Sequence, residues 1–149
     1  MEIEKEIVQS KFKSPMHKGV VNIIFTSNWL HSRQSKLLKP FGLTSQQYNI
    51  LRILRGQHPK PASITLLTER MLDKMSNASR LVEKLLKKKY VERSVCPDDR
   101  RQVNVVINEA GLELLSQMDA LMAEMDQELG PLTDEEYETL SSLLDRLRG

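Results

Sequence analysis

The sequence has few of the residues from which proteins build covalent links or metal sites. It contains one cysteine, Cys96, and three histidines scattered along 149 residues. One cysteine excludes an intramolecular disulfide, and no two histidines have the spacing of zinc ligands. Phosphate-binding glycine loops and the G-x-S-x-G nucleophile motif are also missing. We therefore expect no metal, no cofactor and no enzymatic activity.

Long apolar runs are missing as well. The longest, VVNIIF at residues 20–25, is interrupted by Asn22 and is far shorter than the roughly 20 residues that a membrane-spanning helix needs. The N-terminus, MEIEKEIVQSKFK, is charged and lacks the apolar core of a signal peptide. With 40% hydrophobic and 28% charged residues, the composition is that of an ordinary globular protein. We expect a cytoplasmic protein without a membrane partner.

The net charge of +2 hides a strong asymmetry along the chain. Residues 1–107 carry 20 Lys and Arg against 9 Asp and Glu, a balance of +11, whereas residues 108–149 carry 2 against 11, a balance of −9. A basic region favours a polyanion such as DNA, because Lys and Arg displace the counterions condensed on its phosphates. The alternative is a solvated charge gradient without a binding role.

Helical periodicity predicts three helices in the first half of the chain. The first covers about residues 17–39 and ends at Pro40 and Gly42. The second follows a capping box formed by Thr44 and Gln47, and a short third helix starts after Ser63. The side chains of the second and third helices that we expect in the core are Tyr48, Leu51, Leu54, Ile64, Leu67 and Met71.

A fourth helix, predicted in DKMSNASRLVEKLLKKKY at residues 73–90, has two distinct faces. We expect Asp73 to cap its N-terminus, and apolar residues recur at the spacing of a buried face. The other face carries small hydrogen-bonding residues and then cations: Ser76, Asn77, Ser79 on the flank, Arg80, Lys84 and Lys87. Asn and Arg suit adenine and guanine edges, and the later lysines, Lys84 and Lys87, can reach phosphates. This face is a candidate major-groove reader; an ordinary amphipathic surface helix is the alternative.

After this helix the period changes to that of strands. YVERSV (residues 90–95) and QVNVVI (residues 102–107) predict a hairpin whose tip is CPDDRR. The second, third and fourth predicted helices, followed by this hairpin, have the order of a winged helix-turn-helix. At the tip, Arg100 or Arg101 can enter the minor groove, while Asp98 or Asp99 pairs with an arginine and holds the loop.

The segment SNASRLVEKLLKKKYVERSVCPDDRRQVNVVINEAG resembles the recognition helix and wing of the MarR family of bacterial transcription regulators. DDRR and NEAG stand where that family has its wing motif and the turn into a long helix. The resemblance implies that Ser76, Asn77, Ser79 and Arg80 face the major groove, and that Arg100 or Arg101 enters the minor groove. The chain departs from the family at Leu72 and Lys89, where glycine is common, and Cys96 lies on the predicted wing.

The C-terminal segment predicts two further helices. Asn108 can cap a helix whose apolar residues, from Leu115 to Leu129, follow steps of three and four, the spacing of a coiled-coil-like seam. Thr133 with Glu136 forms a second capping box before a final helix, whose expected inner face carries Leu140, Leu143, Leu144 and Leu147. Their apolar surface exceeds what a small winged domain needs, so we expect them to form a homodimer. An intramolecular hairpin on a monomer is the alternative.

The expected fold is thus mainly α with a small β-hairpin wing (α+β): a winged helix-turn-helix with N- and C-terminal dimerisation helices. The expected regions are 1–43 (N-terminal helix of the dimerisation region), 44–107 (DNA-binding domain) and 108–149 (C-terminal dimerisation helices). A homodimer of this kind presents two recognition helices about one DNA turn apart, as a pseudo-palindromic operator in double-stranded DNA requires.

We expect a sequence-specific transcription regulator, most simply a repressor. The family resemblance also implies a small aromatic effector in a cleft between the DNA-binding lobe and the dimerisation helices. Residues that can line such a cleft are Trp29, His31, Arg33, Tyr48 and Arg52. The alternative from another class is a helical protein-interaction or nonspecific DNA-binding module.

Overall fold

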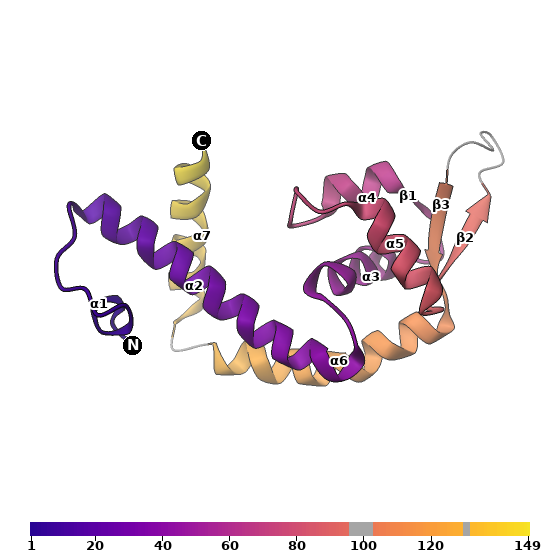
Figure 1. Cartoon of the computed structure of the whole chain (residues 1–149), viewed down its shortest axis with the longest axis horizontal. Helices are drawn as coiled ribbons and strands as arrows, with labels where there is room; N and C mark the ends of the chain where they lie inside the picture. Colours follow the sequence, from indigo (N-terminus) through magenta and orange to yellow (C-terminus); the bar gives the residue numbers. More distant parts are fainter. Residues whose placement is uncertain (96–102, 130–131) are drawn as a thin grey trace. The chain divides into compact units, whose positions relative to one another are not determined.

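The computed structural model describes residues 1–95, 103–129 and 132–149 (Figure 1). Two compact units, residues 1–112 and 113–149, are described in turn. The element order is α1 (Ile3–Glu6), α2 (Pro15–Leu38), the 3-10 helix η1 (Lys39–Phe41), α3 (Ser45–Gln57), β1 (Ala62–Ser63), α4 (Ile64–Arg70), α5 (Ala78–Lys87), β2 (Val91–Val95), β3 (Val103–Ile107), α6 (Glu109–Glu128) and α7 (Asp134–Arg148). This mainly helical fold with a small antiparallel sheet confirms the predicted fold class.

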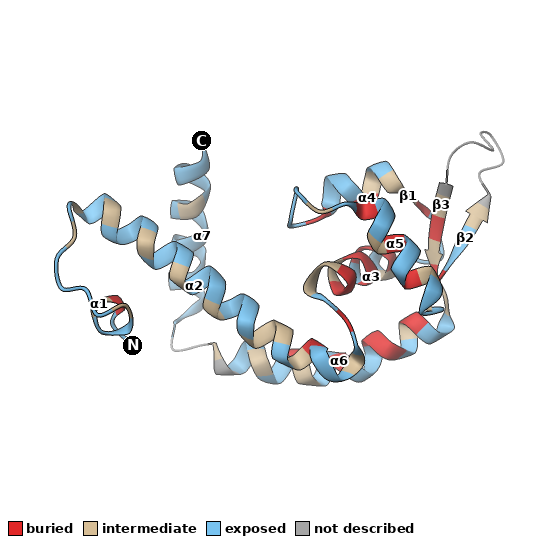
Figure 2. Ribbon diagram, in the orientation of Figure 1, coloured by how far each residue is buried: buried red, intermediate tan, exposed pale blue. Residues whose placement is uncertain are grey.

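The first unit has its core where α3, α4, α5 and the sheet pack together, seen as red ribbon in Figure 2. The predicted core positions Tyr48, Leu51, Leu54, Leu67 and Met71 are all buried, whereas Ile64 is only half-buried. From the other elements the core receives Val82, Leu85, Val105 and Ile107. The periodicity of the sequence therefore identified the inward faces of α3, α4 and α5, with Ile64 as the exception.

The helix starts of the winged domain are fixed by short local hydrogen bonds. Thr44 accepts from the backbone N–H of Gln47 at 3.2 Å, and the Gln47 side chain accepts from the Thr44 N–H at 3.1 Å, so the predicted capping box is present. Ser63 accepts from the N–H of Leu66 at 3.1 Å at the start of α4, also as predicted. Each cap satisfies a backbone donor that the first helical turn leaves open.

The predicted hairpin is present as β2 and β3. They pair antiparallel, with Val91 opposite Ile107 and Val95 opposite Val103. The sequence did not predict β1, whose residues Ala62 and Ser63 pair with Val105 and Asn104 and place β3 in the middle of the sheet. A two-residue strand carries no periodic signal, because it is defined by its distant partner.

A strained residue follows the C-terminal end of α5. Lys89 has a φ of 61°, in the left-handed region, while the N–H of Tyr90 bonds to the carbonyl of Leu85 at 3.2 Å. This is the site where the sequence has lysine instead of the glycine that the resemblance would suggest. A side chain in this region costs roughly 1 kcal/mol or more because Cβ crowds the backbone.

We expect Lys89→Gly to raise the free energy of unfolding by roughly 0.5 kcal/mol, because relief of the crowding exceeds the added backbone entropy of glycine. Urea unfolding measures the change. The matched control is Lys88→Gly, whose backbone is right-handed (φ −79°) and which should be destabilised instead. Destabilisation of both variants to the same extent would contradict the strain assigned to Lys89.

The N-terminal residues form the short helix α1, which the sequence did not predict. Ile3 is buried, and Lys18 of α2 forms an ion pair with Glu4. The long helix α2 matches the predicted helix closely, but much of its apolar stripe is open to solvent: Ile24 is 56% exposed. Within the described ranges, no helix is long and apolar enough to cross a bilayer.

The second unit contains most of α6 and the whole of α7. On α6 the predicted seam residues Leu115, Met118 and Met122 are buried. The predicted capping box of α7 is present, with the N–H of Glu136 donating to Thr133 at 3.3 Å. The face of α7 predicted to point inward is instead open in the single chain, with Leu140, Leu143 and Leu147 between 44% and 60% exposed.

Candidate nucleic-acid interface

Helix α5 separates apolar and polar side chains sharply. Its buried side chains, Ala78, Val82 and Leu85, lie in the core, where α5 packs against α3, α4 and β2. The exposed side chains include most of the residues predicted to read or contact DNA: Asn77, Ser79, Arg80, Lys84 and Lys87; Ser76 is half-buried. One helix thus presents small polar residues at its N-terminal end and cations further along, on a surface that the core holds rigidly in place.

The start of α5 differs from the prediction. Asn77, not Asp73, is the N-cap: its side-chain oxygen accepts from the N–H of Arg80 at 3.0 Å. The helix therefore begins about one turn later than expected. Asp73 and Asn77 can both cap a helix and lie four positions apart, but Asp73 accepts hydrogen bonds within the preceding turn instead. Because the Asn77 oxygen already accepts the cap hydrogen bond, a bidentate contact of Asn77 with a base edge would have to use the second lone pair of that oxygen.

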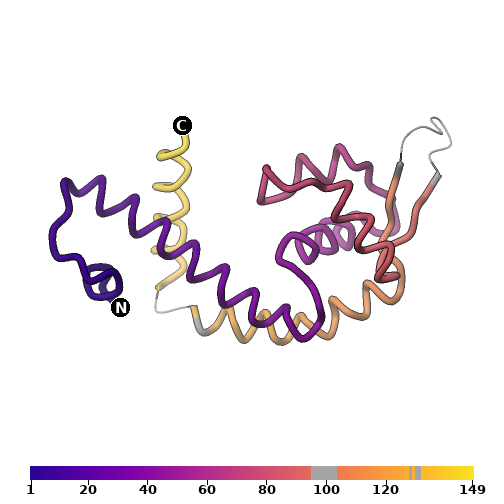
Figure 3. Tube along the Cα trace, in the orientation of Figure 1, coloured from indigo at the N-terminus to yellow at the C-terminus, as the bar shows by residue number. Residues whose placement is uncertain are grey.

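Asp73 organises the turn that precedes α5, which Figure 3 shows between α4 and α5. Its carboxylate accepts from the Ser76 hydroxyl at 2.7 Å and from the N–H of Met75 at 3.0 Å. These hydrogen bonds stabilise the charged form and hold the pKa of Asp73 below its usual value. The interactions are therefore complete at neutral pH and are lost as the pH falls through that lowered pKa.

We expect Asp73→Ala to weaken DNA binding severalfold, although it removes a negative charge from the basic surface, because the turn loses the acceptor of both hydrogen bonds. Asp73→Asn is the matched variant: it removes the same charge but keeps a side-chain oxygen for the N–H of Met75, so it should retain more affinity. Fluorescence anisotropy at neutral pH measures both. Tighter binding by both variants would mean that charge, not turn order, dominates.

An ion pair that was not predicted from the sequence joins α5 to β2. Arg93 on β2 lies 2.5 Å from the carboxylate of Glu83 on α5, and both side chains are about half exposed. An exposed pair contributes at most about 1 kcal/mol to stability. Its effect on the surface is clearer: it neutralises the one acid within α5, which would otherwise repel phosphates. In the sequence, the position of Glu83 between Arg80 and Lys84 was the one signal that this helix carries an ion pair.

The predicted wing-tip residues Asp98, Asp99, Arg100 and Arg101, and the neighbouring Cys96, lie outside the described residues. The strands on either side of the tip are present, so the hairpin that carries it is in place. The minor-groove role of Arg100 or Arg101 stays a prediction.

The five residues predicted to line an effector cleft fall on two helices. On α2, the guanidinium of Arg33 lies over the ring of Trp29 at 5.0 Å, and His31 is exposed. On α3, the guanidinium of Arg52 lies over the ring of Tyr48 at 5.9 Å, and the tyrosine is buried. Four of the five side chains thus form two cation–π pairs, each within a single helix, and such packing needs no bound ligand.

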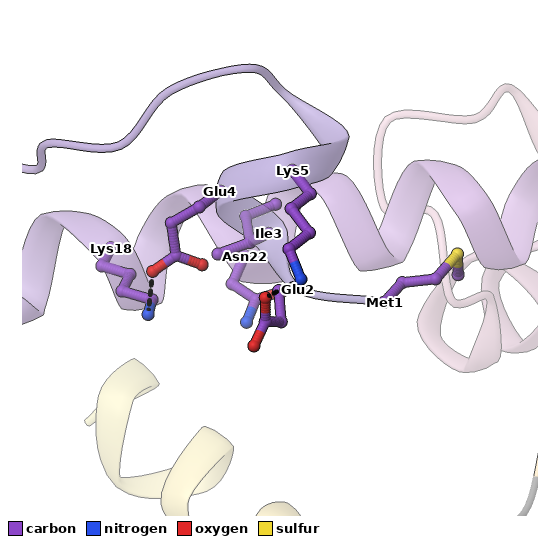
Figure 4. A pocket seen from close by; sticks show the side chains of 7 residues that line it. All are labelled: Met1, Glu2, Ile3, Glu4, Lys5, Lys18 and Asn22. Carbon is purple, nitrogen blue, oxygen red and sulfur yellow. Dashed lines mark hydrogen bonds and ion pairs between the residues drawn. The ribbon is translucent and has the colours of Figure 1, made fainter.

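Two shallow pockets lie beside the N-terminal helix. Figure 4 shows the first, which involves the N-terminal residues, α1 and α2, and includes the Lys18–Glu4 ion pair. Its lining residues are Met1, Glu2, Ile3, Glu4, Lys5, Lys18 and Asn22. The second is lined in part by Phe25 and Trp29. Trp29 is therefore the one predicted cleft residue that borders either of these two pockets.

Comparison with known proteins agrees with this geometry. The model of the MarR family matches residues 41–102, which include α3, α4, α5 and β2. The HTH-type transcriptional regulator MhqR of Bacillus subtilis (strain 168) is 25% identical over 119 residues, covering 79% of this chain and 81% of that protein.

Solved structures are similar over most of the chain. A MarR transcription factor from Planctomyces limnophilus is 27% identical with a TM-score of 0.68, covering 91% of this chain and 98% of that one. The MepR–DNA complex of S. aureus has a TM-score of 0.72 at 22% identity (84% and 92% covered). BpsR of Bordetella bronchiseptica, described as regulated by 6-hydroxynicotinic acid, has a TM-score of 0.74 at 21% identity (93% and 97% covered). The family match and these similarities together support a winged-helix transcription regulator of the MarR family.

Proposed function

We propose that this regulator binds a pseudo-palindromic operator as a homodimer and represses transcription by occupying it. The observation that carries the proposal is the exposed face of α5, which combines Ser79 and Arg80 near the helix start with Lys84 and Lys87 further along. In helix-turn-helix proteins the first residues of the recognition helix contact base edges, and later cations contact phosphates. Such a protein works in the cytoplasm, beside the DNA that it controls.

In this proposal Ser76, Asn77, Ser79 and Arg80 face the major groove, and Lys84 and Lys87 hold the backbone. Arg80 has the role with the most sequence information, because a guanidinium can donate two hydrogen bonds to one guanine. Glu83 stays paired with Arg93, so the cations around it act on DNA without competition from a carboxylate.

Dimerisation is supported by apolar surface that each unit leaves open. On α2, Val20, Ile23 and Ile24 are 41%, 39% and 56% exposed. On α7, Leu140, Leu143 and Leu147 form a stripe at steps of three and four. Contiguous exposed apolar residues of this kind mark interaction sites. Light scattering should give twice the mass of one chain, whereas a monomeric mass at micromolar concentration would remove the basis for two linked recognition helices.

We further propose that a small aromatic molecule changes the spacing of the two DNA-reading lobes and releases the operator. The support is indirect: BpsR is described as regulated by an aromatic acid, and this chain places Trp29 beside a pocket on α2. His31, Arg33, Tyr48 and Arg52 complete the proposed set. Titration of the protein–DNA complex with a panel of aromatic acids tests this step, and no change in DNA affinity across the panel would remove it.

Selection of bound duplexes from a random pool tests the proposal as a whole. At near-physiological salt, we expect enrichment of a pseudo-palindrome with half-sites about one helical turn apart. Salt-sensitive binding without enrichment would instead support a nonspecific DNA-binding or protein-interaction module, whose affinity comes from charge alone.

A further inference from the structure

The turn before the recognition helix holds two large apolar side chains in water. Leu72 is 88% exposed and Met75 is 94% exposed, the highest value among the exposed large hydrophobic residues. Both follow the buried residue Met71, which closes α4. An exposed apolar residue by itself is common on protein surfaces. In this turn, however, the backbone that carries Met75 is held by hydrogen bonds.

Hydrogen bonds fix the turn at both ends. The N–H of Leu72 donates to the side-chain oxygen of Asn49 on α3 at 3.0 Å. The N–H of Met75 donates to Asp73 at 3.0 Å, and the N–H of Ser76 donates to the carbonyl of Asp73 at 3.2 Å. These hydrogen bonds hold the backbone at residues 72–76, and the Met75 side chain on this backbone is 94% exposed.

Met75 lies close to the N-terminal end of α5, which we propose reads DNA. It lies two residues before the N-cap Asn77, so the chain between them spans at most about 7 Å. Exposed cations lie near Met75 in the sequence: Lys74 precedes it directly, and Arg80 and Lys84 follow it on α5. An exposed apolar side chain close to cations suits a polyanion that also offers an apolar group.

DNA offers one such group in the major groove, the C5 methyl of thymine. We propose that Met75 contacts a thymine methyl in each operator half-site and so makes the protein prefer thymine at that position. This inference rests on the proposed function, and it names a base that the hydrogen-bonding residues of α5 do not specify. Methionine suits the contact because its flexible, polarisable side chain adapts to the shape of the base.

The test replaces thymine by deoxyuridine, one position at a time, in the selected operator. This change removes only the methyl group and leaves every hydrogen bond of the base pair intact. Wild-type protein should bind about fourfold more weakly when the contacted methyl is removed, the factor expected for one buried methyl-sized group. The remaining thymines should show no comparable effect.

Protein variants then test whether Met75 is the residue that contacts the methyl group. Met75→Gln keeps the length of the side chain but makes it polar, and it should bind the thymine and uracil operators equally. Met75→Leu should keep the preference. Leu72→Gln is the matched control from the same turn, and it should discriminate like the wild type. A merely structural role of Met75 would lower affinity for both duplexes by the same factor.

Three results would overturn the inference. The first is that wild-type protein binds equally well when any thymine is replaced by deoxyuridine. The others are that Met75→Gln still prefers thymine, or that Leu72→Gln loses this preference. All three require a selected operator. Failure to select any operator would instead count against the proposed function, so the two failures are distinguishable.

Discussion

Replacing Arg80 by alanine should weaken binding to the operator by about 5- to 150-fold, which corresponds to roughly 1 to 3 kcal/mol for one bidentate base contact. Arg80 is exposed in the first turn of α5, and its backbone N–H is fixed by the Asn77 cap at 3.0 Å. The side chain therefore starts from a defined position at the end of the helix that we propose enters the groove. Titration of labelled operator and of scrambled duplex measures the effect.

The matched control is Lys87→Ala, at the other end of the same helix. Lys87 is exposed in the last turn of α5, where we expect a phosphate contact. Its loss should weaken binding to all duplexes by about the same factor and reduce the salt dependence by about one counterion. Arg80→Ala should in addition relax the preference at one operator position. Equal losses on operator and scrambled DNA from both variants would show that Arg80 does not read a base.

Gly111→Ala should destabilise the fold strongly, by roughly 2 kcal/mol or more, although alanine is the better helix former. A Cβ at Gly111 would lie 2.3 Å from the backbone carbonyl oxygen of Tyr90 and 2.7 Å from Cγ1 of Ile107. Real Cβ atoms do not approach so closely, and the backbone oxygen cannot move aside without shifting the start of β2. The gain in helix propensity, about 1 kcal/mol, is smaller than the cost of that shift.

Gly19→Ala is the control, because Gly19 lies within α2 and a Cβ there would meet nothing within 4 Å. It should stabilise the protein by about 0.5 to 1 kcal/mol through propensity alone. Denaturant unfolding of the two variants should therefore give changes of opposite sign. Stabilisation by both would mean that the close approach of α6 to Tyr90 and Ile107 is not maintained in solution.

Local signals explain why so much of the fold could be predicted from the sequence. The capping residues Thr44, Ser63 and Thr133 act on backbone groups three residues away, so their patterns are visible within one turn. The buried faces of α3 and α5 follow the helical period. The elements that were missed depend on distant partners: β1 pairs with β3, and α1 is held by the burial of Ile3 and by an ion pair with α2.

The candidate site was predictable to the same degree. The polar face of α5 followed from its period, but the choice between Asp73 and Asn77 as the cap did not, because both residue types cap helices well. The structure distinguishes them: Asp73 bonds within its own turn, and Asn77 bonds to α5. The sequence shows Glu83 as an acid between two cations, but it does not identify Arg93 as its partner, since the pair depends on how β2 packs beside α5.

Helix α7 shows the limit of periodicity. Its apolar stripe was identified, but the period does not say whether the same chain or a second copy covers it. In the single chain Leu143 and Leu147 are 53% and 60% exposed, so the predicted inner face is open. A partner surface is the simplest way to cover it, and the dimer proposal depends on that step.

The most direct test of the central claim, that α5 reads sequence, is the ratio of affinities for the selected operator and a scrambled duplex of equal length. We expect wild-type protein at near-physiological salt to bind the operator at least about a thousandfold more tightly, within the range of sequence-specific regulators. A ratio near one, with both affinities falling steeply as salt increases, would contradict the claim and leave the basic surface as a nonspecific polyanion site.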